Sequence, residues 1–191
     1  MRTTLILAAS LGLVLVSSAF AQAPVPTVAG VTLPATADVG GKTLVLNGVA
    51  LRKKVIVKVY VAGLYLPANS SDGAAILAAD EPRRLVMQFV RDVDAGKMCD
   101  AWGESLKNNT PGASDELKTQ FTQLCGWMED LKKGDVMAFT YDPAVGTMVE
   151  VKGQGKGTVP GKEFADALFK SWIGPKPGPG DGFKKDLLGR K

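Results

Sequence analysis

The feature of this chain that most restricts its fold is the segment from Leu44 to Pro67, which reads LVLNGVALRKKVIVKVYVAGLYLP. Two apolar runs, the second rich in β-branched and aromatic residues, flank the basic triplet Arg52-Lys53-Lys54. Such residues favour strands, and two strand-like runs around a short polar interruption are typical of a hairpin with a basic turn. Both faces of the second run are largely apolar. This predicts a central strand, covered on both sides over much of its length.

The rest of the chain alternates strand patterns and helix patterns in a fixed order. Strands are indicated by apolar alternation, and helices by apolar residues at helical spacing behind the capping residues Asp94 and Ser114. The expected elements after the hairpin are a short helix at Asp72–Asp80, a strand at Arg83–Val93, helices behind Asp94 and Ser114, strands at VMAFTY and TMVEVKGQGKGTV around a turn at Asp142–Gly146, a helix at Glu163–Trp172, and a short tail ending DLLGRK. This order predicts an α+β domain, with an antiparallel sheet backed by helices on one face.

Three glycines, Gly153, Gly155 and Gly157, lie within the last predicted strand. Their spacing is not that of the G-x-G-x-x-G loop that cradles phosphates, and the strands around them have an antiparallel pattern. We interpret this stretch as a flexible or bulged strand.

The start of the chain has the pattern of an exported protein. A charged start, an apolar stretch and small residues before a cleavage point are found at Met1-Arg2, Leu5–Val16 and Ala19-Phe20-Ala21. We expect cleavage near Ala21 and a protein that is periplasmic or secreted. An apolar run of about a dozen residues is shorter than the roughly 20 that span a membrane, so no integral membrane segment is expected after cleavage. Residues 22–34 form an extended lead-in, and residues 35–191 a single domain.

Composition excludes several classes of site. The chain has no histidine among its 191 residues. This excludes Ser-His-Asp and Cys-His nucleophiles, His-liganded zinc and the usual imidazole proton shuttle, and we expect neither a metal nor a cofactor. The formal net charge is +4, but the basic residues are interleaved with Asp and Glu. A nucleic-acid binder shows a concentrated basic face, so no nucleic-acid partner is expected. No pattern predicts an oligomeric state.

Two cysteines, Cys99 and Cys125, fall within the two middle helix patterns. In an exported chain such a pair can oxidise to a disulfide. The alternative is two separately buried thiols, since cysteine packs well as a small apolar residue. A C-x-x-C redox motif is absent.

Several parts of the chain resemble the chalcone isomerase family, whose members include plant isomerases, fatty-acid-binding relatives and exported bacterial proteins. The similar parts are the hairpin, the strand pair around Tyr141, and the sequence from Gly161 through FADALFKSWIG. The resemblance extends from about Lys42 to the terminal DLLG. It implies the open-faced β-sandwich of that family, with a ligand cleft between the sheet and the helices.

The resemblance also implies three ligand-binding residues. Arg52 stands where the family's arginine reaches the anionic or carbonyl oxygen of the ligand, and a guanidinium suits a carboxylate or phenolate because it offers several donors in a rigid fork. Tyr60 stands where fatty-acid-binding relatives tend to keep a tyrosine and isomerases a threonine. Ser171 corresponds in type to a residue that touches a flavonoid hydroxyl. The alternatives are that Arg52 is a solvated turn residue and that Tyr60 fills the core.

The middle helix lacks two residues on which the isomerases depend. The family's catalytic tyrosine and asparagine align with Met98 and Ser105. We therefore predict no catalytic residues, and a non-catalytic binding protein for a fatty-acid-like or aromatic anionic small molecule. Two alternatives stay open. One is an isomerase of the intramolecular lyase type, acting on a chalcone-like or other enone substrate. The other is a periplasmic structural or interaction protein whose cleft is closed.

Overall fold

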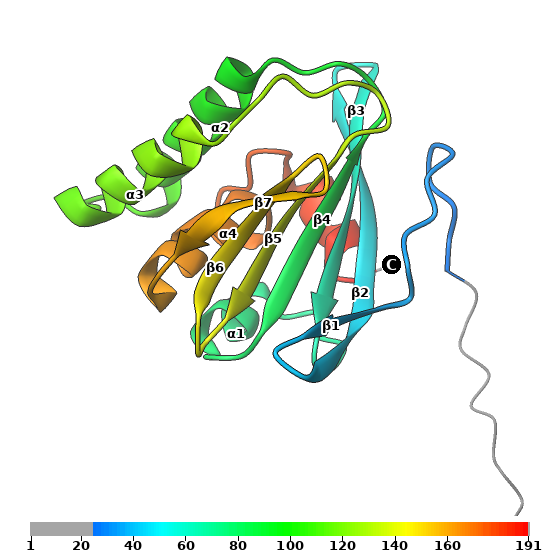
Figure 1. Cartoon of the computed structure of the whole chain (residues 1–191). Coiled ribbons are helices and arrows are strands. Elements are labelled where there is room, and N and C mark those ends of the chain that lie inside the picture. Colours follow the sequence, from blue (N-terminus) through cyan, green and yellow to red (C-terminus); the bar gives the residue numbers. More distant parts are fainter. Residues whose placement is uncertain (1–24, 191) are drawn as a thin grey trace, which may run out of the picture.

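Seven antiparallel strands follow one another in chain order across one sheet, β1-β2-β3-β4-β5-β6-β7, in the computed structural model, which describes residues 25–190 (Figure 1). The strands are β1 (Thr36–Val39), β2 (Lys42–Lys54), β3 (Val57–Leu66), β4 (Arg83–Phe89), β5 (Val136–Asp142), β6 (Gly146–Val151) and β7 (Gln154–Val159). The helices are α1 (Gly73–Ala78), α2 (Ala95–Asn109), α3 (Asp115–Gly126), α4 (Lys162–Ile173) and α5 (Asp181–Leu187). The expected signal peptide and its cleavage point at Ala21 lie outside the described residues.

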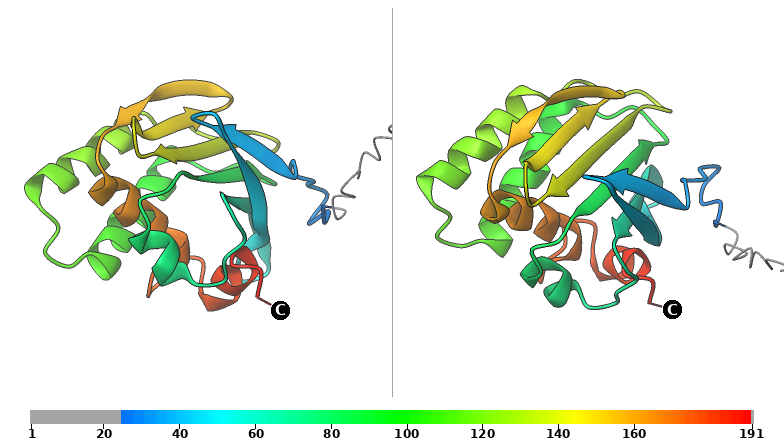
Figure 2. Two further views of the ribbon diagram at one scale, coloured as in Figure 1. Left: turned by 90° about the horizontal axis from the view of Figure 1, so that it is seen from below. Right: turned by 60° about the horizontal axis from the view of Figure 1, so that its bottom comes forward.

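The sheet is curled, and α1, α4 and α5 lie on its concave side (Figure 2). The main core fills this concave side, where Phe139 of β5 packs against Trp102 of α2 and Trp172 of α4, with ring centroids 5.6 and 5.7 Å away. The predicted α+β fold, an antiparallel sheet backed by helices, is confirmed. Among the described residues, no helix combines the length and the apolar character that crossing a bilayer would require.

The convex face of the sheet is partly covered by the segment that precedes β1. Val31 and Leu33 are buried there against Val61 of β3. A side-chain carbon on Gly63 would lie only 2.5 Å from a methyl carbon of Leu33. The glycine that interrupts the apolar run of β3 is therefore needed for close packing of this segment.

The prediction that the basic triplet forms the turn of the first hairpin is wrong, because the turn follows the triplet. Arg52, Lys53 and Lys54 remain in β2 and pair with Tyr60, Lys58 and Val57 of β3. The two residues outside the ladder are Val55 and Ile56, and Val55 takes a positive φ of 57°. The predicted coverage of β3 on both sides holds for its buried second half, whereas the end of the strand next to the turn is exposed.

Two further sequence-based expectations need correction. The stretch TMVEVKGQGKGTV is not one strand but two, β6 and β7, joined at Lys152 and Gly153, which both have positive φ. Positive φ at both turn residues is the geometry of a tight two-residue hairpin. The supposed C-terminal tail contains α5, which packs on β2. A side-chain carbon on Gly48 would lie 2.4 Å from the carbonyl oxygens of Asp186 and Leu187.

Candidate functional site

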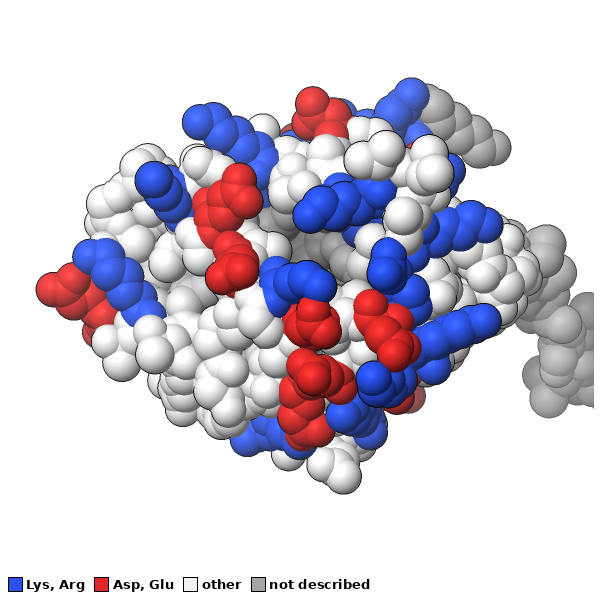
Figure 3. All heavy atoms as spheres, turned by 90° about the horizontal axis from the view of Figure 1, so that it is seen from above, with Lys and Arg blue, Asp and Glu red and all other residues white. Residues whose placement is uncertain are grey.

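A cleft of about 790 Å³ opens between the β2–β3 hairpin, the end of β4, helix α2 and the loop between α4 and α5. This volume lies within the range of roughly 300–1,000 Å³ that is typical of small-molecule sites. Seen from above, this end of the molecule is hollowed and bordered by charged side chains (Figure 3). The three predicted ligand-binding residues, Arg52, Tyr60 and Ser171, all line this cleft.

The inner wall of the cleft is apolar and aromatic. It is formed by Tyr60, Met87, Phe89, Met98, Trp102 and Trp172. The Tyr60 ring packs 5.5 Å from Phe89 and 5.9 Å from Phe183, measured between ring centroids. Along this wall, an apolar ligand body would therefore meet aromatic rings and methionine thioethers.

A hydrogen bond from Trp172 determines which role the Tyr60 hydroxyl can take toward a ligand. Trp172 donates its indole N–H to this hydroxyl over 3.1 Å. Because an indole nitrogen can only donate, the Tyr60 oxygen is the acceptor, and the hydroxyl proton has no acceptor among the described residues. Tyr60 can therefore donate a hydrogen bond to a ligand in the cleft.

Arg52 lies beside Tyr60, its direct partner across the β2–β3 ladder. Its guanidinium donates to the carbonyl oxygen of Pro179 over 3.0 Å, and the side chain is half-buried. The alternative of a freely solvated turn residue does not hold, since Arg52 is in a strand and is fixed by this bond. One of its five N–H donors is used in this way, so others remain for a ligand oxygen.

Ser171 of α4 lies at the same cleft, and its hydroxyl is buried without a hydrogen-bond partner. A buried polar group without a partner is uncommon in folded proteins, and it calls for a water or a ligand. Met98 and Ser105, which align with the isomerase tyrosine and asparagine, also line the cleft. The two positions that the resemblance assigns to the isomerase pair therefore lie at this cleft, but neither holds a tyrosine or an asparagine.

Sequence reasoning missed the loop that closes one side of the cleft. Residues 174–180 read GPKPGPG, and the Asn109 side chain anchors the loop by donating to the Lys176 carbonyl (2.9 Å) and accepting from the Lys176 N–H (2.8 Å). The loop supplies Pro179, the partner of Arg52. Its dense proline and glycine content was the available signal, because these residues favour turns and loops, and loops commonly carry binding residues.

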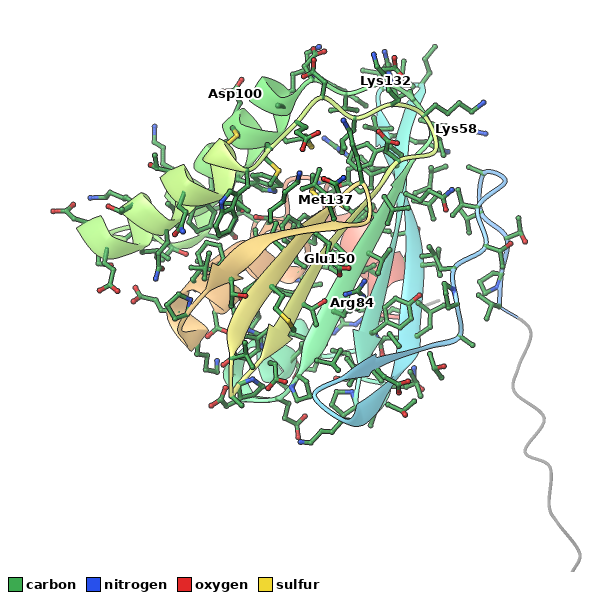
Figure 4. The ribbon with its side chains drawn as sticks, viewed as in Figure 1. Lys58, Arg84, Asp100, Lys132, Met137 and Glu150 are labelled. Carbon is green, nitrogen blue, oxygen red and sulfur yellow. A yellow bond between two sulfur atoms is a disulfide. The ribbon has the colours of Figure 1, made fainter. Side chains whose placement is uncertain are left out.

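The mouth of the cleft carries charges of both signs. The sequence pattern did not predict that these residues lie together, because they come from separate elements. Basic side chains there come from Arg52, Lys54, Arg91, Lys97 and Lys176, and acidic ones from Asp92, Asp100, Glu104 and Asp181. Asp100 lies on α2 at the upper rim in Figure 4. Among the described residues, no cluster of three metal-ligating side chains is found.

Burial raises the pKa of Tyr60 to about 12, against the opposing effects of the Trp172 hydrogen bond and the Arg52 charge. Burial likewise raises the pKa of Tyr65 and of Tyr141 to about 12. The chain has no other tyrosine. All three hydroxyls therefore stay protonated at neutral pH, and Tyr60 remains a donor.

We expect the folded protein to show little tyrosinate absorbance at pH 10, where a tyrosine in an unfolded chain is half ionised. A pKa that is higher in the folded state favours the protonated form, so the corresponding stability is complete below pH 10 and is lost as the pH rises from 10 to 12. Spectrophotometric titration with and without denaturant measures both effects. A native titration with its midpoint near 10 would contradict the burial of these hydroxyls.

Comparisons with known proteins agree with the fold of the chain. The model of a family described as chalcone isomerase-like matches residues 25–189. Among solved structures, a fatty-acid binding protein of Arabidopsis thaliana is similar, with a TM-score of 0.66 and 21% identity, covering 86% of this chain and 94% of that chain. At this identity the likeness shows a shared fold. Among curated protein sequences, none matches the chain.

Proposed function

Because the chain belongs to the chalcone isomerase-like family, we propose that it is a non-catalytic binding protein for a small anionic amphiphile, either fatty-acid-like or aromatic. The observation that carries this proposal is the pairing of Arg52 with Tyr60 at the edge of an apolar, aromatic cleft. We also propose that the protein is exported and acts outside the cytoplasm.

The two polar groups complement a carboxylate. Arg52 supplies a charged donor, and Tyr60 supplies a neutral one whose proton has no other acceptor in the described structure. Bonds from an ionised donor are stronger than neutral ones, so Arg52 would account for most of the polar affinity. The rings of Phe89, Trp102 and Trp172 would cover the hydrocarbon or aromatic body.

The ligand class is supported, at the level of a proposal, by the fatty-acid binding that is named for the Arabidopsis protein. Catalysis has less support. The resemblance places Met98 and Ser105 where isomerases hold a tyrosine and an asparagine, and both residues line the cleft. The Met98 thioether cannot donate a hydrogen bond to a substrate ketone, and Ser105 offers a hydroxyl in place of a carboxamide. Incubation with a hydroxychalcone tests the alternative, since cyclisation faster than the spontaneous rate would establish isomerase activity.

Titration calorimetry with dodecanoate and hexadecanoate tests the proposal on the chain that begins at Gln22. We expect Arg52→Ala to weaken binding roughly tenfold to a hundredfold, because a hydrogen bond to a charged group contributes about 1.5–3 kcal/mol. Lys53→Ala is the matched control, since it removes one positive charge from the neighbouring, exposed position of β2. Absence of binding by the unchanged protein, or equal binding by it and Arg52→Ala, would refute the proposal.

A further inference from the structure

The tip of the β2–β3 hairpin exposes apolar side chains to an unusual degree. Val55, Ile56 and Val57 are 91%, 88% and 40% exposed, and they are three of the four large exposed apolar residues in the described part of the chain. The fourth, Val145, stands alone in the β5–β6 turn. Single exposed apolar residues are common, whereas three in a row at a protruding tip indicate a contact surface.

The backbone conformation of this tip is one that its β-branched side chains disfavour. Val55 is the first of the two turn residues and has a φ of +57°, and Ile56 has no positive φ. Hairpins with positive φ at the first turn position favour glycine there, and a β-branched residue in this region is strained. Compared with glycine, valine at this position therefore lowers both the local stability of the hairpin and the solubility of the protein. Choices that oppose the fold in this way are expected at functional sites.

The apolar tip is flanked by basic side chains. Lys53, Lys54 and Lys58 are exposed next to it, and none has a carboxylate partner within ion-pair distance among the described residues. The whole hairpin from Lys42 to Leu66 contains no acidic residue. Lys58 lies at the same end of the molecule as Lys132, which is paired with Asp92 (Figure 4).

We propose that this tip docks on an anionic lipid bilayer, with Val55, Ile56 and Val57 in the interfacial layer and Lys53, Lys54 and Lys58 at the headgroups. Apolar side chains gain free energy by entering the boundary between headgroups and acyl chains, and lysines near the surface add electrostatic attraction to anionic lipids. A protein partner fits this surface less well, because lysine is depleted in protein–protein interfaces.

The tip lies beside the cleft, so docking through the tip connects to the proposed binding function. Lys54 and Val59 belong to the hairpin and also line the cleft. Docking through the tip would therefore hold the mouth of the cleft near the bilayer surface, where amphiphiles partition. The inference goes beyond the proposed function and does not require it, since docking can be measured with an empty cleft.

Vesicle flotation tests the proposal with the chain that begins at Gln22, which keeps every described strand and helix. We expect flotation with vesicles of phosphatidylcholine and phosphatidylglycerol, weaker flotation with phosphatidylcholine alone, and a decrease as salt is added. Val55→Gly with Ile56→Ser should lower partitioning roughly tenfold or more, because it removes most of the apolar surface of the tip. Val145→Ser, at the other exposed apolar position, should have no effect.

The double variant also separates docking from misfolding. Gly-Ser suits this turn better than Val-Ile, so its melting temperature should be equal to or higher than that of the unchanged protein. No flotation with either vesicle, or equal flotation of the unchanged protein and the double variant, would overturn the proposal. Sedimentation without lipid is the remaining check. Self-association that the double variant abolishes would assign the tip to a second copy of the chain and overturn the bilayer assignment.

Discussion

Replacing Arg83 with leucine is expected to lower the free energy of unfolding by about 3–5 kcal/mol, the usual cost of removing one partner from a buried ion pair. Arg83 is only 1% exposed, although it is a charged residue at the start of β4. Its guanidinium pairs with Asp166 of α4, and it donates to the carbonyl oxygens of Ile76 (3.1 Å) and Ala79 (3.4 Å). The side chain thus joins the sheet to two helices.

The surroundings of Arg83 explain why its loss is costly. The guanidinium carbon lies 4.8 Å from the centroid of the Tyr141 ring and 5.0 Å from that of Phe169, so two aromatic faces also stabilise the cation. Leucine would restore apolar contact but leave two carbonyl groups without their donor. Asp166 would keep only Lys162 as a partner. The energy lost is therefore mainly that of unsatisfied buried groups.

The neighbouring residue provides a matched control. Arg84 points to the opposite face of β4, pairs with Glu150 and also donates to Thr140. Figure 4 shows Arg84 and Glu150 on the face of the sheet turned away from α4 and α5. This pair is more accessible to solvent, with side chains 23% and 35% exposed. We expect Arg84→Leu to cost about 1 kcal/mol, since partly exposed ion pairs contribute little.

Urea unfolding of the two variants, followed by circular dichroism, measures the difference. The expected result is a much lower midpoint for Arg83→Leu than for Arg84→Leu, with similar slopes. Equal midpoints would mean that burial of Arg83 is not the source of its contribution. A double variant, Arg83→Leu with Asp166→Leu, should recover part of the loss, because it removes both charges rather than leaving one.

Periodicity predicted those elements whose pattern is long or capped. The Asp72 side chain accepts from the N–H groups of Ala74 and Ala75, and that of Ser114 accepts from Leu117, as N-caps do. Asp94 precedes α2 as predicted but makes no capping bond, and Asp130 accepts from the Ala95 N–H instead. A cap supplied from 35 residues away cannot be found by local pattern.

The alternation of apolar and polar residues in β4 indicates which of its two arginines is buried, whereas composition alone does not. Arg83 shares its strand face with Leu85, Met87 and Phe89, all buried, whereas Arg84 shares the opposite face with Gln88. The pattern could therefore indicate which arginine is buried. It could not indicate Asp166 as the partner, because that contact joins residues far apart in the chain.

Errors in the sequence-based description occurred where local preference and the fold disagree. Val55 and Ile56 have strong strand preference, so the local pattern predicts the turn at the basic triplet before them. Helix α5 is short and follows a proline-rich loop, and its position depends on packing against Gly48. The family resemblance predicts Arg52 and Tyr60 as ligand-binding residues. Their placement in one cleft also required α5 and the loop that holds Pro179.

Removing the link between Cys99 and Cys125 is expected to lower the free energy of unfolding by about 3 kcal/mol. In the structure these residues of α2 and α3 form a disulfide that closes a loop with a sequence separation of 26. A loop of this size restricts the unfolded chain by about that amount in the chain-entropy description. Cys99→Ala with Cys125→Ala tests this by urea unfolding, and adding reductant to the unchanged protein should reproduce the loss.

Helix α3 should nevertheless stay docked in this variant. Leu117, Phe121 and Leu124 are buried, and the Phe121 ring lies 5.3 Å from that of Phe164 in α4. The native fold and its circular dichroism should therefore persist at low denaturant. The affinity of the cleft for dodecanoate is expected to fall only slightly. Met98 and Trp102 line the cleft from α2, and α2 keeps its own contacts with α4.

Counting free thiols separates this link from the alternative of two separately buried cysteines. After unfolding without reductant, the unchanged protein should bind no alkylating reagent, and after reduction it should bind two equivalents, as its two cysteines require. Two equivalents bound without reductant would show unlinked thiols. In that case the double alanine variant should lose only the energy of packing two small side chains. Reductant has no effect on the variant in either case, so the difference between the two proteins isolates the disulfide.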